Sequence, residues 1–227
     1  MTALIRRKYP HLFWILPVLA IVALASFGPP IVSATEQQDA LALMKEGRTL
    51  VISHDCSGCH GGADPSMKGW LDGVRSPIQE FLIGPCANPA TPTAQPCFHT
   101  HPRNLTPDNA TGLGRFTERQ IFNALRYGLR PEDTPDVEIT GTTAGKGNFP
   151  ANPHYLAPPM PWPAWRHMTD HQLKAIAAYL KRAVKPSDNK VLDSEGPPDF
   201  WASEYTVEKI GPLKSPAFPT ANEQVPK

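Results

Sequence analysis

Two cysteines and a histidine stand together in Cys56-Ser57-Gly58-Cys59-His60, with types and spacing that can bind a cofactor covalently. The order C-x-x-C-H is the attachment pattern of a c-type haem. Two thiols three positions apart on a helical turn lie on one side of it, where each can add to one haem vinyl group. The imidazole of the next residue then points at the iron as the proximal ligand. The motif therefore predicts one covalently attached haem c, held by Cys56, Cys59 and His60.

Two other uses of a C-x-x-C pair compete with this interpretation. A thioredoxin-type redox pair follows a strand in a βαβ pattern, which the sequence lacks. A zinc site requires a second ligand pair, which Cys86 and Cys97 could supply, although their separation is far from that of a zinc knuckle. A zinc-stabilised structural module therefore stays open as an alternative. It predicts no visible colour and a fold that chelators disrupt.

A low-spin electron carrier also requires a second axial ligand, commonly methionine or histidine. Met67 lies only seven residues past His60 and would struggle to reach the opposite haem face. Met168 stands at the start of a predicted helix, where packing explains it better. Met160 lies in Pro158-Pro159-Met160-Pro161, where prolines fix φ and hold the backbone extended. We therefore expect Met160 to be the distal ligand.

Histidines are the other candidates for this position. His99 and His101 lie in a long loop and are the second choice. His54 is too close to His60 in sequence to reach the far face easily. The remaining histidines after the motif are expected to be exposed or structural: His154, His167 and His171.

Two helices are expected in the second half of the chain. Capping boxes begin at Thr117 and Thr169, each with a glutamine three residues later, and an apolar stripe of helical period follows each. These patterns predict helices over residues 117–127 and 169–184. Gly128 supplies the stop signal for the first of them.

A third helix is expected immediately before the cysteine motif. Thr35 or Asp39 can cap it, and an apolar stripe follows. Gly47 permits close approach of a neighbouring helix, which we expect to present Tyr179 and Leu180. This arrangement would deliver the chain to the motif.

The composition excludes several classes of protein. The chain has 227 residues and a net charge of +1, so it lacks the basic excess of a nucleic-acid-binding protein. It contains 27 prolines, about 12% against a usual value near 5%. Because helices and strands tolerate interior proline poorly, a tight helical bundle and a regular parallel-sheet domain are both disfavoured.

Residues 1–34 are typical of an export signal. Basic residues at 6–8 precede a mostly apolar run over 12–27, and Val32-Ser33-Ala34 places small residues before a cleavage point at Thr35. The run is shorter than the roughly 20 residues that span a membrane as a helix. A cleaved signal is the first interpretation, and an uncleaved membrane anchor is the alternative.

Taken together, these residues resemble class I cytochromes c over roughly residues 40–185. The middle elements look like the larger cytochromes that serve as electron-transfer subunits of bacterial periplasmic or membrane-bound dehydrogenases. The resemblance is carried by the cysteine motif and by five further segments: Asn104-Leu105-Thr106-Pro107-Asp108, Thr111-Gly112-Leu113-Gly114, Ala124-Leu125-Arg126-Tyr127-Gly128, Pro159-Met160-Pro161-Trp162 and Ala177-Ala178-Tyr179-Leu180.

The resemblance implies an all-α chain with the class I cytochrome c fold, in a cytochrome c domain over residues 35–185. A proline-rich insertion over about 63–103 departs from a minimal cytochrome. With Cys56 and Cys59 taken by haem, Cys86 and Cys97 of this insertion are left as a pair and are expected to form a disulfide in an oxidising compartment. A proline-rich tail over 186–227 is expected to wrap over the domain in extended form.

The resemblance also implies the function of an electron carrier rather than an enzyme. Its iron would be ligated by His60 and Met160, within a pocket expected to include Trp70, Phe116, Leu125, Trp162 and Trp165. The side chains of Arg103 and Asn104 are expected to hold haem propionates.

The implied partners are other redox proteins: a dehydrogenase, an oxidase or other cytochromes. The expected location is the periplasm, either soluble or anchored to the outer face of the inner membrane through the N-terminal segment. The alternative function is a haem enzyme or gas sensor with an open or displaceable sixth iron position.

Overall fold

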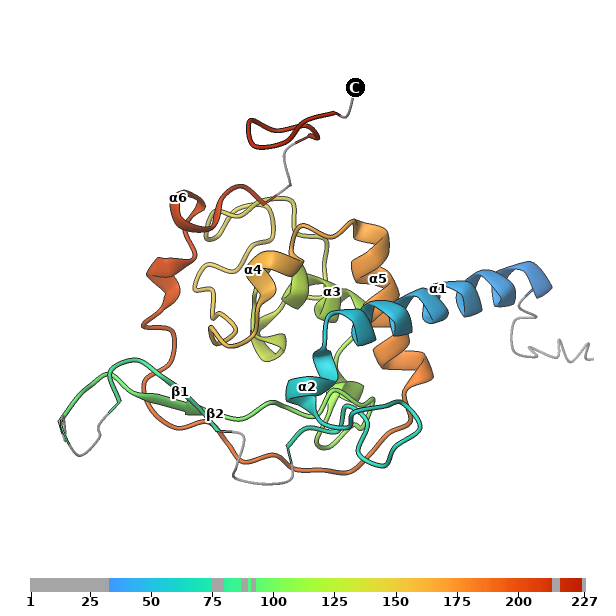
Figure 1. Ribbon diagram of the computed structural model, residues 1–227, viewed down its shortest axis with the longest axis horizontal. Coiled ribbons are helices and arrows are strands. Elements are labelled where there is room, and N and C mark those ends of the chain that lie inside the picture. The colour runs from blue at the N-terminus through green and yellow to red at the C-terminus, as the bar shows by residue number, and fades with distance from the viewer. Residues whose placement is uncertain (1–32, 75–79, 87–89, 91–92, 214–216, 226–227) are drawn as a thin grey trace, which may run out of the picture.

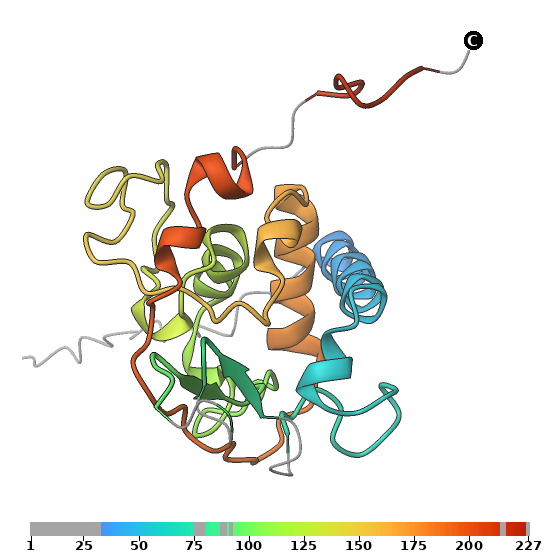
Figure 2. The ribbon, with the colours of Figure 1, turned by 60° about the vertical axis from the view of Figure 1, so that its left-hand side comes forward.

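Three helices form the centre of the computed structural model, which describes residues 33–74, 80–86, 90, 93–213 and 217–225. They are α1 (Ala34–Ser53), α3 (Glu118–Tyr127) and α5 (Asp170–Ala178), and α5 continues through a π-helical turn, η3 (Tyr179–Ala183). Figure 2 shows α5 between α1 and α3, and α5 contacts both. Shorter elements complete the described chain: α2 (Cys56–His60), β1 (Phe81–Ile83), β2 (Phe98–Thr100), η1 (Leu113–Arg115), η2 (Pro131–Asp133), α4 (Trp162–Trp165), η4 (Ala202–Glu204) and α6 (Val207–Ile210).

The starts of the helices follow local capping chemistry. Thr117 and Thr169 each cap a helix within a complete capping box, as the sequence predicts, and Gly128 ends α3 with a φ of 68°. The cap of α1 was predicted wrongly. It is Ser33, whose hydroxyl accepts a hydrogen bond from the Glu36 backbone while the Glu36 carboxylate accepts one from the Ser33 backbone.

The predicted close approach at Gly47 is confirmed. A Cβ on this glycine would stand 2.0 Å from the carbonyl oxygen of Ala175 and 2.8 Å from Cβ of Tyr179. Only glycine lets the α1 backbone lie directly on α5 at this point. The crossing closes one side of an apolar core that also includes Val51, Leu173 and Leu180.

The prediction of an all-α chain with the class I cytochrome c fold is wrong. Helices of all kinds make up 37% of the described residues, most are short, and a small antiparallel sheet is present. In this sheet β1 pairs with β2, with Phe81 opposite Thr100 and Ile83 opposite Phe98. The sheet forms inside the proline-rich insertion, where aromatic and β-branched residues favour short strands and the prolines prevent long helices.

A disulfide joins Cys86, just after β1, to Cys97, just before β2. Its S–S distance is 1.96 Å and its Cα–Cα distance is 4.6 Å. The bond therefore ties together the two strands of the insertion at one end.

Between η3 and η4 the chain is extended and runs over the outside of the molecule (Figures 1 and 2). Glu195 forms an antiparallel bridge with His99 of β2, and the Asn189 side-chain amide donates to the Asp72 carbonyl at 2.6 Å. Trp201 is only 3% exposed and lies against Phe98. The first part of the tail is therefore built into the core.

The predicted signal or anchor falls, except for its last two residues, outside the described residues. Within the described ranges, no helix combines the length and the apolar character needed to cross a membrane.

Candidate functional site

The cysteine motif forms α2, a single helical turn that follows α1 directly. Asp55 precedes it in the left-handed conformation, with a φ of 53°, and Gly61 ends it with a φ of 90°. A Cβ on Gly61 would stand 2.7 Å from the Gly73 carbonyl oxygen. Glycine therefore lets the chain turn back against residues 69–73 immediately after His60.

The imidazole of His60 is fixed by a backbone carbonyl. Its Nδ1–H donates to the carbonyl oxygen of Arg103 at 2.7 Å. Burial lowers the pKa of His60, and this hydrogen bond has a smaller effect in the opposite direction. The ring is therefore neutral at neutral pH, with the lone pair of Nε2 available to a metal.

The thiols of Cys56 and Cys59 are free and partly buried. Burial raises the pKa of Cys56 to about 12, and burial with the nearby charge of Asp55 raises the pKa of Cys59. Both groups are therefore protonated thiols at neutral pH. Cys56 also packs against the main apolar core.

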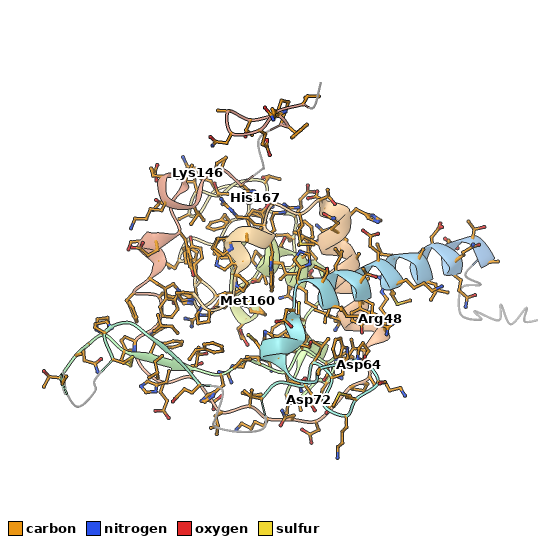
Figure 3. All side chains as sticks on the ribbon, in the orientation of Figure 1. Arg48, Asp64, Asp72, Lys146, Met160 and His167 are labelled. Atoms are coloured by element: carbon orange, nitrogen blue, oxygen red, sulfur yellow. A yellow bond between two sulfur atoms is a disulfide. The ribbon has the colours of Figure 1, made fainter. Side chains whose placement is uncertain are left out.

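Met160 packs against the same apolar core as Cys56. Its turn is held by two backbone hydrogen bonds, from Met160 to the Ala157 carbonyl at 2.9 Å and from Trp162 to the Met160 carbonyl at 2.8 Å. Figure 3 shows Met160 near the centre of the molecule. Met168 also contacts this core, whereas Met67 is 53% exposed.

The predicted pocket residues separate into two groups. Trp70, Phe116 and Leu125 belong to the core that Cys56 and Met160 contact, and Trp165 packs against the same core. Trp162 instead stacks on Tyr155, with ring centroids 6.3 Å apart, and packs tightly on Gly128. Tyr179 has a contact that the sequence did not indicate: its hydroxyl accepts a hydrogen bond from Trp70 Nε1 at 3.0 Å.

The two histidines that were the second choice have other contacts. Nδ1 of His99 lies 2.9 Å from Glu80 Oε1, and its Nε2 lies 3.3 Å from Cys97 Sγ. His101 is 8% exposed, with Nε2 3.9 Å from the same carboxylate oxygen. Neither residue is placed with Cys56 in the apolar core.

The side chains of Arg103 and Asn104, which were expected to hold haem propionates, contact the tail in this structure. The Arg103 guanidinium donates to the Leu192 carbonyl at 2.8 Å, and the Asn104 amide donates to the Ser187 carbonyl at 2.8 Å. The contact of Arg103 with His60 is made by its carbonyl, which no sequence signal reveals because every residue has one.

The zinc alternative has no second ligand pair, because Cys86 and Cys97 are joined to each other. In the part of the chain that the structure describes, no group of three or more His, Cys, Asp or Glu residues could hold a metal ion.

The donor set at α2 fits a c-type haem. Two free thiols stand one helical turn apart, a neutral imidazole has its Nδ1 occupied by a carbonyl, and a thioether borders the same apolar core. These are the groups and surroundings that such a haem requires.

In comparison with known proteins, the chain is similar in sequence to cytochrome c subunits of bacterial dehydrogenases. It is 30% identical to the gluconate 2-dehydrogenase cytochrome c subunit of Pantoea cypripedii over 69% of this chain and 26% of that protein. It is 28% identical to the fructose dehydrogenase cytochrome subunit of Gluconobacter japonicus over 64% of this chain and 22% of that protein.

A third relative is the cytochrome c subunit of the quinone alcohol dehydrogenase of Gluconobacter oxydans (strain 621H). It is 26% identical over 83% of this chain and 30% of its own length. The chain therefore spans about a quarter of the length of the curated relatives it matches. No family model matches the chain.

These matches confirm the predicted resemblance to cytochrome c subunits of dehydrogenases. They also agree with a carrier rather than an enzyme, since each of these relatives is the cytochrome subunit of its dehydrogenase.

Proposed function

We propose that this protein transfers electrons through a single covalently attached haem c, as part of or in contact with a dehydrogenase complex. The observation that carries the proposal is the arrangement at α2: two unpaired thiols and a histidine whose Nδ1 is already held by the Arg103 carbonyl. The similarity to cytochrome c subunits of dehydrogenases supports the same conclusion independently.

Each residue of the site has a distinct part in this proposal. Cys56 and Cys59 anchor the haem through thioether bonds, and His60 offers Nε2 as the proximal ligand. Met160 offers its thioether as the distal ligand. A haem held in this way supplies reversible one-electron chemistry between ferric and ferrous iron.

The protein around the site favours the less charged ferrous state. Methionine ligation raises the potential of a haem, and exclusion of water by Trp70, Phe116 and Leu125 acts in the same direction. The Arg103 carbonyl orients the His60 ring and strengthens its basicity, as outer partners of metal-bound histidines do.

The proposed partners are a dehydrogenase that donates electrons and an oxidase or second cytochrome that accepts them. The proposed location is the periplasm, either free or anchored to the outer face of the inner membrane by residues 1–34. The names of the relatives support the dehydrogenase, and the export-type sequence of residues 1–34 supports the location.

Intact mass measurement tests the covalent attachment. The full chain is produced in a host that attaches c-type haem. We expect the mass of the polypeptide, either complete or without residues 1–34, plus the mass of one haem. The double variant Cys56→Ala, Cys59→Ala should lose this added mass. The matched double variant Cys86→Ala, Cys97→Ala should keep it, because these cysteines are bonded to each other.

Absence of the haem mass from the unmodified chain, despite competent attachment machinery, would contradict the proposal. Retention of the haem mass in the Cys56→Ala, Cys59→Ala variant would contradict the assigned anchors. The N-terminal boundary found in the same spectrum also reports whether residues 1–34 have been removed.

A further inference from the structure

A second group of chemically active residues lies at the small sheet, outside the site at α2: His99 is in β2, and Glu80 and Cys97 directly precede β1 and β2. Nε2 of His99 lies 3.3 Å from Cys97 Sγ, and Nδ1 of the same ring lies 2.9 Å from Glu80 Oε1. This is the order of a thiol, a base and an orienting carboxylate. Cys97 is oxidised in this structure, because its sulfur is bonded to Cys86.

We propose that Cys86–Cys97 is a thiol–disulfide exchange site for a dithiol reductant, in which Cys86 is attacked and Cys97 is the leaving group stabilised by His99. The proposal does not depend on the haem, since none of its residues belongs to the α2 site.

The two sulfurs differ in access and in surroundings. Cys86 is partly exposed, whereas Cys97 is only 6% exposed. An incoming thiolate can therefore reach Cys86 more easily. Exchange is faster when the departing sulfur is the better leaving group, and a neighbouring imidazolium stabilises a thiolate. Access and leaving-group stability therefore favour the same direction of attack.

The reduction balances in two steps. A thiolate of the dithiol bonds to Cys86 Sγ, the Cys86–Cys97 bond breaks, and its electron pair leaves on Cys97 Sγ. His99, protonated from solvent at Nε2 and held at Nδ1 by Glu80, donates a hydrogen bond to that thiolate. The second thiol of the reductant loses its proton to solvent. The resulting thiolate attacks the reductant sulfur that is bonded to Cys86 and closes the reductant's own disulfide. Cys86 leaves as a thiolate and is protonated by solvent.

The His99–Glu80 pair is open to solvent protons. A cavity of about 370 Å³ lies over it, lined by Glu80, His99, His101, Leu192, Asp193 and Glu195. His99 is also held from its backbone, since its N–H donates to the Glu195 carbonyl at 2.8 Å. The imidazole therefore stays beside Cys97 while it exchanges protons with water.

The test is the rate of reduction of the folded full-length holoprotein by dithiothreitol. Free thiols are trapped with N-ethylmaleimide at successive times and counted by intact mass. We expect His99→Gln to slow reduction by roughly tenfold, because the departing Cys97 sulfur then has no imidazole beside it to stabilise its negative charge. Glu80→Gln should slow it less, because the imidazole remains.

His154→Gln is the matched control. Its imidazole also faces a carboxylate, with Nδ1 3.0 Å from Asp133 Oδ2, but the structure gives it no sulfur contact. We expect its reduction rate to equal that of the unmodified protein. If His99→Gln disturbs β2, Glu80→Gln still tests the proposal, because it removes the charge of the carboxylate and keeps the size of the side chain.

Equal rates for the unmodified protein, His99→Gln and Glu80→Gln would overturn the proposal. So would a disulfide that is reduced only after unfolding. The number of thiols labelled with N-ethylmaleimide distinguishes a failure of this proposal from a failure of the proposed haem attachment. Two thiols labelled before reduction would mean that Cys56 and Cys59 are not attached, and the comparison of rates would remain valid.

Discussion

His60 depends on a backbone carbonyl, rather than on a side chain, for its orientation. The Arg103 carbonyl accepts a hydrogen bond from Nδ1 of His60, while the Arg103 guanidinium donates to the Leu192 carbonyl and the Ser194 hydroxyl in the tail. The same residue therefore connects the proposed proximal ligand to the segment that wraps the molecule. Substitution of its side chain leaves the carbonyl in place and acts on His60 only through the path of the chain.

Met160 is the residue whose proposed role is most directly testable. Met160→Ala removes the thioether and should open the sixth iron position. We expect the visible spectrum of the reduced variant to shift on addition of carbon monoxide, while the unmodified reduced protein does not respond. Met168→Ala is the matched control, because Met168 borders the same apolar core and is expected to leave carbon monoxide excluded.

Two results would contradict this assignment. Ready binding of carbon monoxide by the unmodified protein would favour the enzyme or gas-sensor alternative. A spectral shift with carbon monoxide in Met168→Ala, and not in Met160→Ala, would indicate that Met168 rather than Met160 is the distal ligand.

Among the elements, the crossing of α1 and α5 is the most demanding contact. Gly47→Ala places a Cβ 2.0 Å from a backbone oxygen of α5, so the helices must separate. We expect the free energy of unfolding to fall by about 1–3 kcal/mol, although alanine favours a helix over glycine by about 1 kcal/mol. Urea denaturation followed by circular dichroism measures the change.

Gly141→Ala is the control for this experiment. A Cβ at Gly141 meets nothing closer than 3.4 Å, and the backbone there is not in the left-handed region. Its stability should change by no more than about 0.5 kcal/mol. A Gly47→Ala variant as stable as Gly141→Ala would show that the helices adjust without cost.

Elements with a local signal could be predicted from the sequence, and elements without one could not. The capping boxes at Thr117 and Thr169 act within one helical turn, so their helices were found with nearly correct bounds. Ser33 was missed because the same small residues also fit a cleavage site. The strands were missed because three residues each are too few to show a period, and because the paired residues lie 15 to 19 positions apart in the sequence.

At the scale of the whole molecule, the first part of the tail, up to residue 211, is packed against the rest of the chain. Trp201 and Val191 are buried, and the Arg166 guanidinium donates to the Gly211 carbonyl at 2.8 Å. A chain ending after Lys185 loses burial worth at least about 3 kcal/mol. We therefore expect its Tm to fall by roughly 10 °C in calorimetry.

A chain ending after Gly211 is the comparison. It keeps every contact named above and should melt within about 2 °C of the full chain. Equal melting temperatures for the two shortened chains would mean that residues 186–211 contribute little to stability.

The tail also shows what sequence reasoning could not supply. Wrapping was expected from its prolines, but the residues that hold it are far away in the chain. Asp72, Arg103 and Asn104 bind residues 187–194 across more than 80 positions. No local pattern marks such partners, so the sequence did not indicate that Arg103 and Asn104 hold the tail.

The length of α1 determines how far the start of this helix lies from the cysteine motif. Its 20 residues span about 30 Å, from exposed turns at Ala34 that extend beyond α5 to the end that leads into α2 (Figure 1). A segment attached to the start of this helix, such as a retained membrane anchor, is therefore separated from the cysteine motif by the full length of α1. Removing one turn ahead of Gly47 would shorten the helix by about 5.4 Å and leave the crossing in place. In an anchored carrier, α1 would then determine how far from the membrane surface electrons are exchanged.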